Sequence, residues 1–288
     1  MPETFSFDPP AEPAPIRDAA TVIVLRDGPH GVESLLLQRH GRSGFAADAW
    51  VFPGGVVDAP DAALPPPRWT GIDPVARAAR FQATPERTLA LHVAAVRETF
   101  EESGLLLASR PDGSAVDIEA ASVAAMRRRL ADRDDPAGAA EFNAWLAEED
   151  LVLELGRLEY WARWITPVWE KRRYDTRFFL ARAPEGQVAA FDDVETTGQH
   201  WIRARDALAA AERRELHMIY PTIKNLEALA EACGDVGGID AAFACAAAME
   251  RIGTVLPHFE PTDDGGFRVL HPDDPDYPTE RYAAELAR

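Results

Sequence analysis

Residues 97–105 read Arg97-Glu98-Thr99-Phe100-Glu101-Glu102-Ser103-Gly104-Leu105. On a helix, Glu98, Glu101 and Glu102 stand at positions i, i+3 and i+4, so their three carboxylates crowd one face. Like charges at these spacings destabilise a helix by roughly a few tenths of a kcal/mol per pair. A bound cation would relieve the repulsion, and Mg²⁺ takes oxygen ligands of this kind, usually together with substrate phosphates. The stretch therefore predicts a helical site for a divalent metal ion.

The boundaries of this helix are also visible in the sequence. Thr84 is a suitable N-cap and Pro85 suits the first helical position. Gly104 provides the C-terminal stop. Apolar residues at helical spacing, which lie off the acidic positions, are Leu89, Val93, Val96 and Phe100. We therefore expect a helix with one packed face and one charged face.

Strands are expected on both sides of this helix. The β-branched and apolar segments that predict them are 20–26, 34–39, 50–52, 160–167, 177–182 and 199–202. Further helices are expected at 74–81, within 117–150, at 206–215 and at 221–233. This order predicts a mixed sheet that is covered by helices on both faces.

The acidic helix and the turn Phe52-Pro53-Gly54-Gly55 together resemble the signature of the Nudix hydrolases. That signature runs Gly, five residues, Glu, seven residues, and then Arg-Glu-apolar-x-Glu-Glu-x-Gly-apolar. Its second half matches residues 97–105, with Thr99 at the apolar place. Its first half departs, because Asp61 follows Gly55 at the spacing of the expected Glu, and Leu89 lies eight positions before Arg97. About thirty additional residues separate the two halves.

The resemblance implies an α/β/α sandwich with a mixed sheet, helical insertions and a C-terminal helical extension. We expect a flexible N-terminal tail over 1–18 and a Nudix domain over 19–232. Insertions are expected at about 59–84 and 108–150. Residues 233–288 are expected to form a C-terminal helix and an extended tail.

The resemblance also implies a chemistry for the acidic residues. Glu98, Glu101 and Glu102 are expected to hold Mg²⁺ or Mn²⁺ over a diphosphate, with the backbone carbonyl of Gly54 or Gly55 as a further ligand. The bound ions would neutralise phosphate oxygens and lower the pKa of an attacking water. Arg97 is expected to orient a neighbouring glutamate through hydrogen bonds.

Other candidates come from loops and strand ends. Glu195, six residues before Trp201, is expected to act as the general base, with Glu98 as the alternative. Arg39 and Arg177 are candidates for binding substrate phosphate, because a planar guanidinium matches phosphate geometry. Residues 127–129 are three arginines that are expected to lie on a solvated helix face.

Composition limits the partners. The chain of 288 residues has a formal net charge of −18, which argues against a nucleic-acid partner. It has no apolar run long enough to span a membrane and no signal-peptide pattern, so we expect a cytoplasmic protein that does not bind membranes. The sequence leaves the oligomeric state open, with a homodimer as one candidate.

The long insertion, the wording of residues 51–58 and Tyr220-Pro221-Thr222 before a Leu-containing helix resemble a subgroup of acyl-coenzyme A diphosphatases. The implied reaction cleaves coenzyme A or acyl-CoA to 3′,5′-ADP and (acyl)phosphopantetheine. Two alternatives remain: an ADP-ribose or NADH pyrophosphatase of the Nudix type, and a Nudix-fold module that binds a ligand without catalysis. The missing signature glutamate motivates the second alternative.

Overall fold

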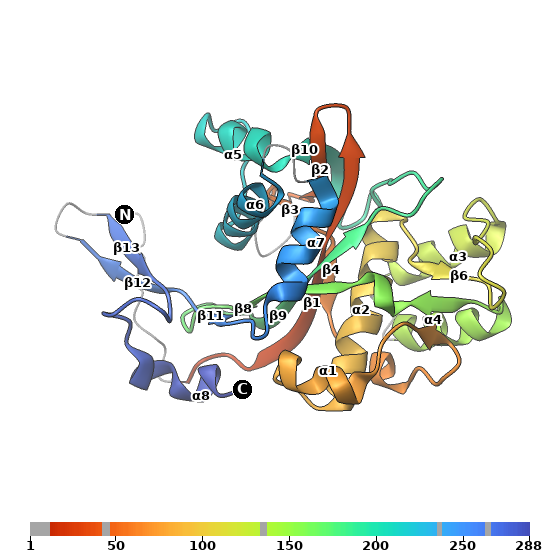
Figure 1. Cartoon of the computed structure of the whole chain (residues 1–288), viewed down its shortest axis with the longest axis horizontal. Helices are drawn as coiled ribbons and strands as arrows, with labels where there is room; N and C mark the ends of the chain where they lie inside the picture. Colours follow the sequence, from red (N-terminus) through yellow and green to blue (C-terminus); the bar gives the residue numbers. More distant parts are fainter. Residues whose placement is uncertain (1–11, 42–46, 133–136, 235–237, 263–265) are drawn as a thin grey trace.

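The computed structural model describes residues 12–41, 47–132, 137–234, 238–262 and 266–288. Within them, the centre of the fold is an eight-stranded mixed sheet whose main path is β10-β2-β1-β9-β8-β11 (Figure 1). Strand β3 pairs with β2, and β4 pairs with β1. The strands are β1 (Ile16–Gly28), β2 (Gly31–Arg39), β3 (Trp50–Val51), β4 (Gly54–Val56), β8 (Glu159–Ile165), β9 (Arg173–Arg182), β10 (Thr196–Arg203) and β11 (Thr254–Val255).

Alternating side chains of β1 enter two different cores, because successive residues of a strand point to opposite faces. Val22 and Val24 pack in the core that contains helix α2 (Pro85–Ser103). Ile23 and Leu25 pack in the core that contains the other helical layer. That layer comprises α5 (Ala204–Glu212), α6 (Tyr220–Cys233) and α7 (Gly238–Ala248). The predicted α/β/α sandwich with a mixed sheet is therefore confirmed.

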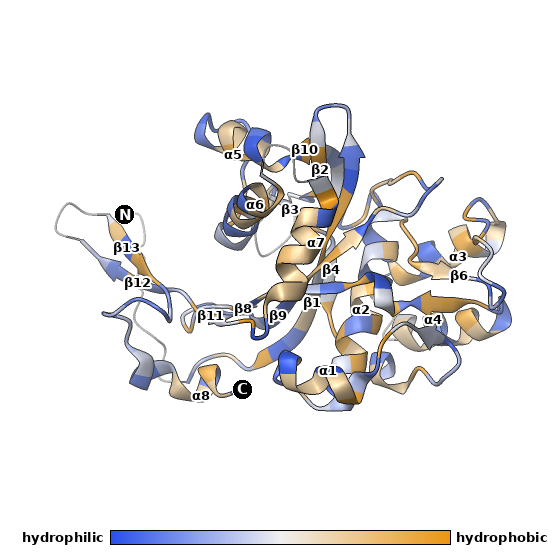
Figure 2. Cartoon of the chain, viewed as in Figure 1, coloured by the Kyte–Doolittle hydropathy of each residue, from blue (hydrophilic) through white to orange (hydrophobic). Residues whose placement is uncertain are grey.

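Hydrophilic residues lie at the tip of the β1–β2 hairpin, which projects beyond the two cores (Figure 2). Figure 2 also shows a predominantly hydrophobic α7. Part of the predicted N-terminal tail, residues 1–11, lies outside the described residues, and β1 begins at Ile16. Within the described part of the chain, no helix is both long and apolar enough to cross a membrane.

Helix α2 begins and ends where its sequence predicts. The Thr84 hydroxyl accepts a hydrogen bond from the Arg87 N–H, and Gly104 ends the helix with a φ of 72°. The charged face of the helix is nevertheless buried, because Glu101 and Glu102 are only 7% and 2% exposed. Neighbouring segments cover most of this face, so these two carboxylates are largely shielded from bulk solvent.

Both segments that we expected to be insertions are folded. The first contains η1 (Ala59–Ala63), β5 (Trp69–Thr70) and α1 (Pro74–Phe81), and the second contains β6 (Ala108–Ser109), α3 (Ala121–Leu130) and α4 (Gly138–Glu148). They meet in a small sheet of order β5-β7-β6, where β7 is Val152–Glu154; η2 (Leu155–Arg157) follows β7. On α4, Trp145 stacks on Phe100 of α2, with ring centroids 5.8 Å apart. The second segment thus packs directly on the acidic helix.

The C-terminal segment contains more structure than the tail predicted for it. Strands β12 (His258–Pro261) and β13 (Phe267–Leu270) form a hairpin, followed by η3 (Thr279–Tyr282) and α8 (Ala283–Leu286). A separate core holds Leu256, Leu270, Tyr277 and Tyr282. The hairpin lies at one end of the molecule and α3 and α4 lie at the other (Figure 1).

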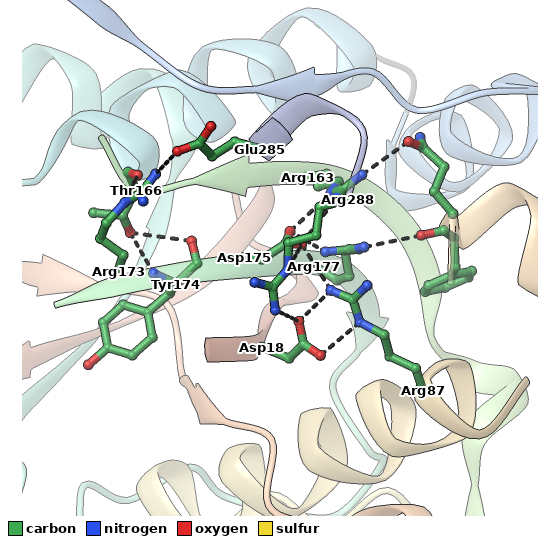
Figure 3. A network of polar contacts seen from close by, with 12 residues as sticks. Asp18, Arg87, Arg163, Thr166, Arg173, Tyr174, Asp175, Arg177, Glu285 and Arg288 are labelled. Atoms are coloured by element: carbon green, nitrogen blue, oxygen red, sulfur yellow. Dashed lines mark hydrogen bonds and ion pairs between the residues drawn. The ribbon is translucent and has the colours of Figure 1, made fainter. Parts of the chain in front are cut away.

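A buried ionic network joins the sheet to its surroundings (Figure 3). The carboxylate of Asp175 on β9 accepts hydrogen bonds from Arg163 at 2.8 and 3.0 Å, from Arg87 at 3.0 Å and from Arg177. Arg87 also pairs with Asp18 on β1. These contacts link β1, β8, β9 and α2 through one fully buried carboxylate.

Candidate active site

A cavity of about 1670 Å³ borders the acidic end of α2. Its lining includes Gly54 and Gly55 from β4, Glu98 and Glu101 from α2, and Glu195 from the loop before β10. The structure thus brings together the predicted glycine turn, two of the three glutamates predicted to bind metal and the predicted base, although 140 residues separate Gly55 from Glu195. The volume of this cavity exceeds that of most small-molecule sites, which is about 300–1,000 Å³.

The glycine turn allows α2 to approach β4 closely. A Cβ atom at Gly55 would lie 2.3 Å from Oε2 of Glu98, so a larger residue would displace that carboxylate. The Gly54 N–H donates to Oε2 of Glu102 at 2.9 Å. Glu102 therefore holds the turn in place, and it is absent from the cavity lining.

Arg97 binds two acidic partners at once. It donates to both carboxylate oxygens of Asp61, at 2.9 and 2.8 Å, and to Oε1 of Glu98 at 2.7 Å. The predicted orientation of a glutamate by Arg97 is consistent with this geometry. Asp61 is fully buried and occupies the place of the expected signature glutamate, so the shorter carboxylate still reaches Arg97. The spacing from Gly55 could have predicted this pairing.

The environment of Glu98, Glu101 and Glu102 disfavours their ionised forms. Burial, and then the neighbouring Asp61 and Glu195 carboxylates, raise the pKa of Glu98 to about 7 against the opposing effect of Arg97. Burial and repulsion by Glu98 and Glu102 raise the pKa of Glu101 to about 10. The pKa of Glu102 is raised well above its ordinary value by burial and by Glu195. Such clustering of shifted carboxylates is typical of functional sites.

A tight turn positions Glu195. One carboxylate oxygen of Asp192 accepts hydrogen bonds from the N–H groups of Val194, Glu195 and Thr196, at 2.8 to 2.9 Å. The charge of Glu195 contributes to the raised pKa values of all three glutamates on α2. Asp192 is therefore an organising residue for this loop.

Arg127 has a role that the sequence did not reveal. It was expected on a solvated face, yet its guanidinium donates to the carbonyls of Glu101 at 3.0 Å, Glu102 at 3.1 Å and Ala190. It thereby ties α3 to the C-terminal end of α2 and to the segment that leads to Glu195. The neighbouring Arg128 is exposed, so the expectation holds for that residue.

The two predicted phosphate-binding arginines differ in placement. Arg39 lines the cavity, and its buried Nε has no hydrogen-bond partner among the described residues. Arg177 is fully buried, donates to Asp175 and to the Phe81 carbonyl, and does not line the cavity. The prediction that Arg177 binds substrate is therefore corrected: its charge is already used within the sheet.

The donor set fits a hard divalent ion. Carboxylates and backbone carbonyls are the ligands that Mg²⁺ prefers, and Arg97 alone gives Glu98 and Glu101 little charge compensation because it is shared with Asp61. Across the described residues, no group of three His, Cys, Asp or Glu side chains stands ready to hold an ion. Glu98 and Glu102 instead bond to Arg97 and to Gly54, so ion binding would require their carboxylates to turn.

Comparisons with known proteins agree with this geometry. Residues 74–229 match the family model of the NUDT19 Nudix domain. The chain is 31% identical to the acyl-coenzyme A diphosphatase NUDT19 of Gallus gallus, over 88% of this chain and 76% of that protein. It is 30% identical to the Homo sapiens protein of the same name, over 85% of this chain and 72% of that protein.

A solved structure supports the fold assignment as well. The crystal structure of a Nudix hydrolase from Alicyclobacillus acidocaldarius superposes with a TM-score of 0.65 at 29% sequence identity, covering 80% of this chain and 96% of that one. Nudix proteins are typically dependent on a divalent metal, in line with the donor set around Glu98. The acidic helix, the glycine turn and these similarities together show that the chain belongs to the Nudix hydrolase family, in the group defined by the NUDT19 Nudix domain.

Proposed function

We propose that this protein hydrolyses the diphosphate linkage of coenzyme A or acyl-CoA to 3′,5′-ADP and (acyl)phosphopantetheine. The observation that carries the proposal is the convergence of Glu98, Glu101 and Glu195 on one cavity beside the Gly54-Gly55 turn. About 30% identity to two acyl-coenzyme A diphosphatases over most of the chain supports the choice of substrate class.

In this proposal the chain's own groups have separate roles. Glu98, Glu101 and Glu102, together with a carbonyl of Gly54 or Gly55, would hold Mg²⁺ or Mn²⁺. The bound ion would supply charge neutralisation of the phosphate oxygens and a lowered pKa for water. Glu195 accepts the proton of the attacking water, with Glu98 as the alternative base. The water oxygen bonds to one phosphorus, and the bridging oxygen leaves with the other phosphate.

Binding and orientation of the substrate fall to other residues. Arg39 lines the cavity, its buried Nε has no hydrogen-bond partner among the described residues, and its guanidinium is suited to bind a phosphate oxygen. Arg97 keeps Glu98 in place through its 2.7 Å hydrogen bond.

We further propose that the protein acts on small molecules in the cytoplasm, without a nucleic-acid or membrane partner. A homodimer is a candidate for its oligomeric state.

The deciding experiment is product analysis by mass spectrometry. Purified protein, with Mg²⁺ or Mn²⁺, is incubated with lauroyl-CoA, free CoA, ADP-ribose and NADH. Release of 3′,5′-ADP from the CoA compounds is expected for the wild type and for the control Glu86→Gln, on the exposed first turn of α2. Glu98→Gln is expected to be slower by at least about 10²-fold.

The other outcomes separate the alternatives. Cleavage of ADP-ribose or NADH alone would keep the chemistry and overturn the coenzyme A assignment. Ligand binding without turnover of any compound, with both metals tested, would replace the enzyme by a non-catalytic Nudix-fold module.

A further inference from the structure

The cavity continues far beyond the acidic residues. It extends along β8 and β9 to the start of α6 and to the β12–β13 hairpin. Six aromatic side chains in this second part of the lining form what we call the aromatic arm: Trp164, Trp169, Phe178, Tyr220, Phe259 and Phe267. A diphosphate and its metal ions do not require such a surface.

Phe259 on β12 is the centre of the aromatic arm. Its ring lies edge-on to Trp169, with centroids 5.2 Å apart and an interplanar angle of 90°. It also lies 5.4 Å from Phe267 and 6.3 Å from Tyr220. Tyr220 in turn contacts Trp164 at 6.0 Å. The contacts therefore form a continuous aromatic wall from the edge of the sheet to the hairpin.

The charges along the aromatic arm are balanced. Two acidic residues, Glu170 and Glu260, and two basic residues, Arg172 and Arg281, line it. A 3′,5′-ADP group carries several negative charges and would require an excess of cations. An uncharged, largely apolar chain requires none, and it gains free energy by covering aromatic surface. Phe267 is 56% exposed, although large apolar side chains are usually covered.

We propose that the aromatic arm binds the pantetheine and acyl part of the substrate, and that Phe259 and Phe267 set the preference for acyl-chain length. This inference rests on the proposed function, because it takes acyl-CoA as the substrate. It assigns a role to the C-terminal hairpin, which lies outside residues 74–229 of the matched domain. The diphosphate then lies at Glu98, and the acyl chain extends toward the hairpin.

The test compares acyl-chain selectivity between variants. kcat/KM is measured for free CoA, acetyl-CoA and lauroyl-CoA with wild type, Phe259→Ala and Phe267→Ala. The matched control is Phe243→Ala, whose half-buried ring on α7 lies outside the cavity lining. We expect the ratio of lauroyl-CoA to free CoA to fall by about 10- to 100-fold in Phe259→Ala, and less in Phe267→Ala. The control should keep the wild-type ratio.

Three outcomes would overturn the inference. An unchanged ratio with equally lowered kcat/KM for all three compounds would place the nucleotide, rather than the acyl chain, in the aromatic arm. Unchanged kinetics throughout would remove any substrate role. Unchanged kinetics with an altered mass in light scattering would make the hairpin a contact between copies of the chain.

A binding measurement separates this inference from the proposed function. Lauroyl-CoA is titrated into wild type and Phe259→Ala in EDTA, where no hydrolysis is expected. Binding that depends on Phe259, without hydrolysis in Mg²⁺, would support the aromatic arm and reject the proposed activity. Hydrolysis of CoA compounds without any dependence on Phe259 would support the proposed activity and reject the role of the aromatic arm.

Discussion

Asp61 and Arg97 form the pair on which the acidic helix depends for its charge balance. Both side chains are almost completely buried, and both oxygens of Asp61 are bonded to the guanidinium. Burial raises the pKa of Asp61, while its contacts with Arg97 oppose that shift. Removal of either partner would leave the other charge buried without compensation, which strongly destabilises a fold.

We predict that Asp61→Ala lowers the free energy of unfolding by about 3–5 kcal/mol, as expected when a buried pair is broken. Activity should fall as well, because Arg97 would no longer hold Glu98 in one position. Urea denaturation and kcat measure the two effects. Glu141→Ala, which breaks the exposed pair with Arg129, is the control and should cost about 1 kcal/mol or less. Equal losses in both variants would contradict this account.

Arg127 connects elements that the sequence places far apart. Its contacts with the carbonyls of Glu101 and Glu102 satisfy orphan acceptors at the end of α2, while its contact with Ala190 holds the segment before Glu195. The α3 segment is thus part of the support of the site. Its geometry should weaken if this one side chain is removed.

We predict that Arg127→Ala costs about 1.5–3 kcal/mol of stability, the range for hydrogen bonds to a charged group. kcat should fall by about 10- to 100-fold, because displacement of catalytic groups by about 1 Å has effects of this size. Thermal unfolding and steady-state kinetics provide the measurements. The exposed neighbour Arg128→Ala serves as control. A normal kcat in a destabilised Arg127→Ala would limit the residue to a structural role.

The packing of α1, α2 and β9 depends on a neutral histidine. His92 is fully buried between Phe81 and Phe179, and its Nδ1 lies 2.7 Å from the Thr88 carbonyl oxygen. Burial lowers its pKa to about 3, from an ordinary 6.5. The unfolded chain therefore binds the proton first as the pH falls. The contribution of neutral His92 to the free energy of unfolding is complete above about pH 6.5 and is lost toward pH 3 by up to about 1.4 kcal/mol per pH unit.

We predict that His92→Phe removes this contribution and flattens the pH dependence of the unfolding free energy between pH 6.5 and 4. Urea denaturation at each pH measures the slope. His30→Asn, at the exposed turn between β1 and β2, is the control and should leave the slope unchanged. The same slope in His92→Phe and wild type would show that other groups dominate acid unfolding.

Elements with local signals were predictable, and elements held by distant contacts were not. Thr84, Pro85 and Gly104 define α2 within its own sequence, so its bounds agree with the structure. The β12–β13 hairpin has strands of only four residues in a Pro-, Asp- and Gly-rich segment, and Phe259 packs on Trp169, which is 90 residues away. The role of Arg127 was not predictable for the same reason, because its partners Glu101, Glu102 and Ala190 are distant in sequence and approach it only when α3 packs onto α2.

At the scale of the whole molecule, Asp175 joins parts of the fold that belong to different layers. Its partners come from α2, β8 and β9, and Arg288 lies 3.8 Å away (Figure 3). Three guanidiniums donate to this one carboxylate, and one of them, that of Arg87, also donates to Asp18. The loss of the Asp175 charge should therefore destabilise the entire domain rather than one edge.

We predict that Asp175→Asn lowers the free energy of unfolding by about 3–5 kcal/mol, with fluorescence and circular dichroism transitions that still coincide. Asp240→Asn, which alters the exposed pair between Arg182 and Asp240, is the matched control and should cost less than about 1 kcal/mol. Separate transitions by the two probes would indicate that the network stabilises only a local region.

The parallel pairing of β1 with β9 also determines when the fold can form. Ile16 pairs with Arg173, so the central strand waits for a partner that is synthesised about 150 residues later. At roughly 5–20 residues per second, this delay is on the order of ten to thirty seconds. During that time the β1–β2 hairpin can form, but the edge of β1 that later pairs with β9 leaves its backbone N–H and C=O groups unpaired, and open edges of this kind invite aggregation. Production of this protein should therefore benefit from available chaperones, which can cover this strand until β9 has been synthesised and pairs with it.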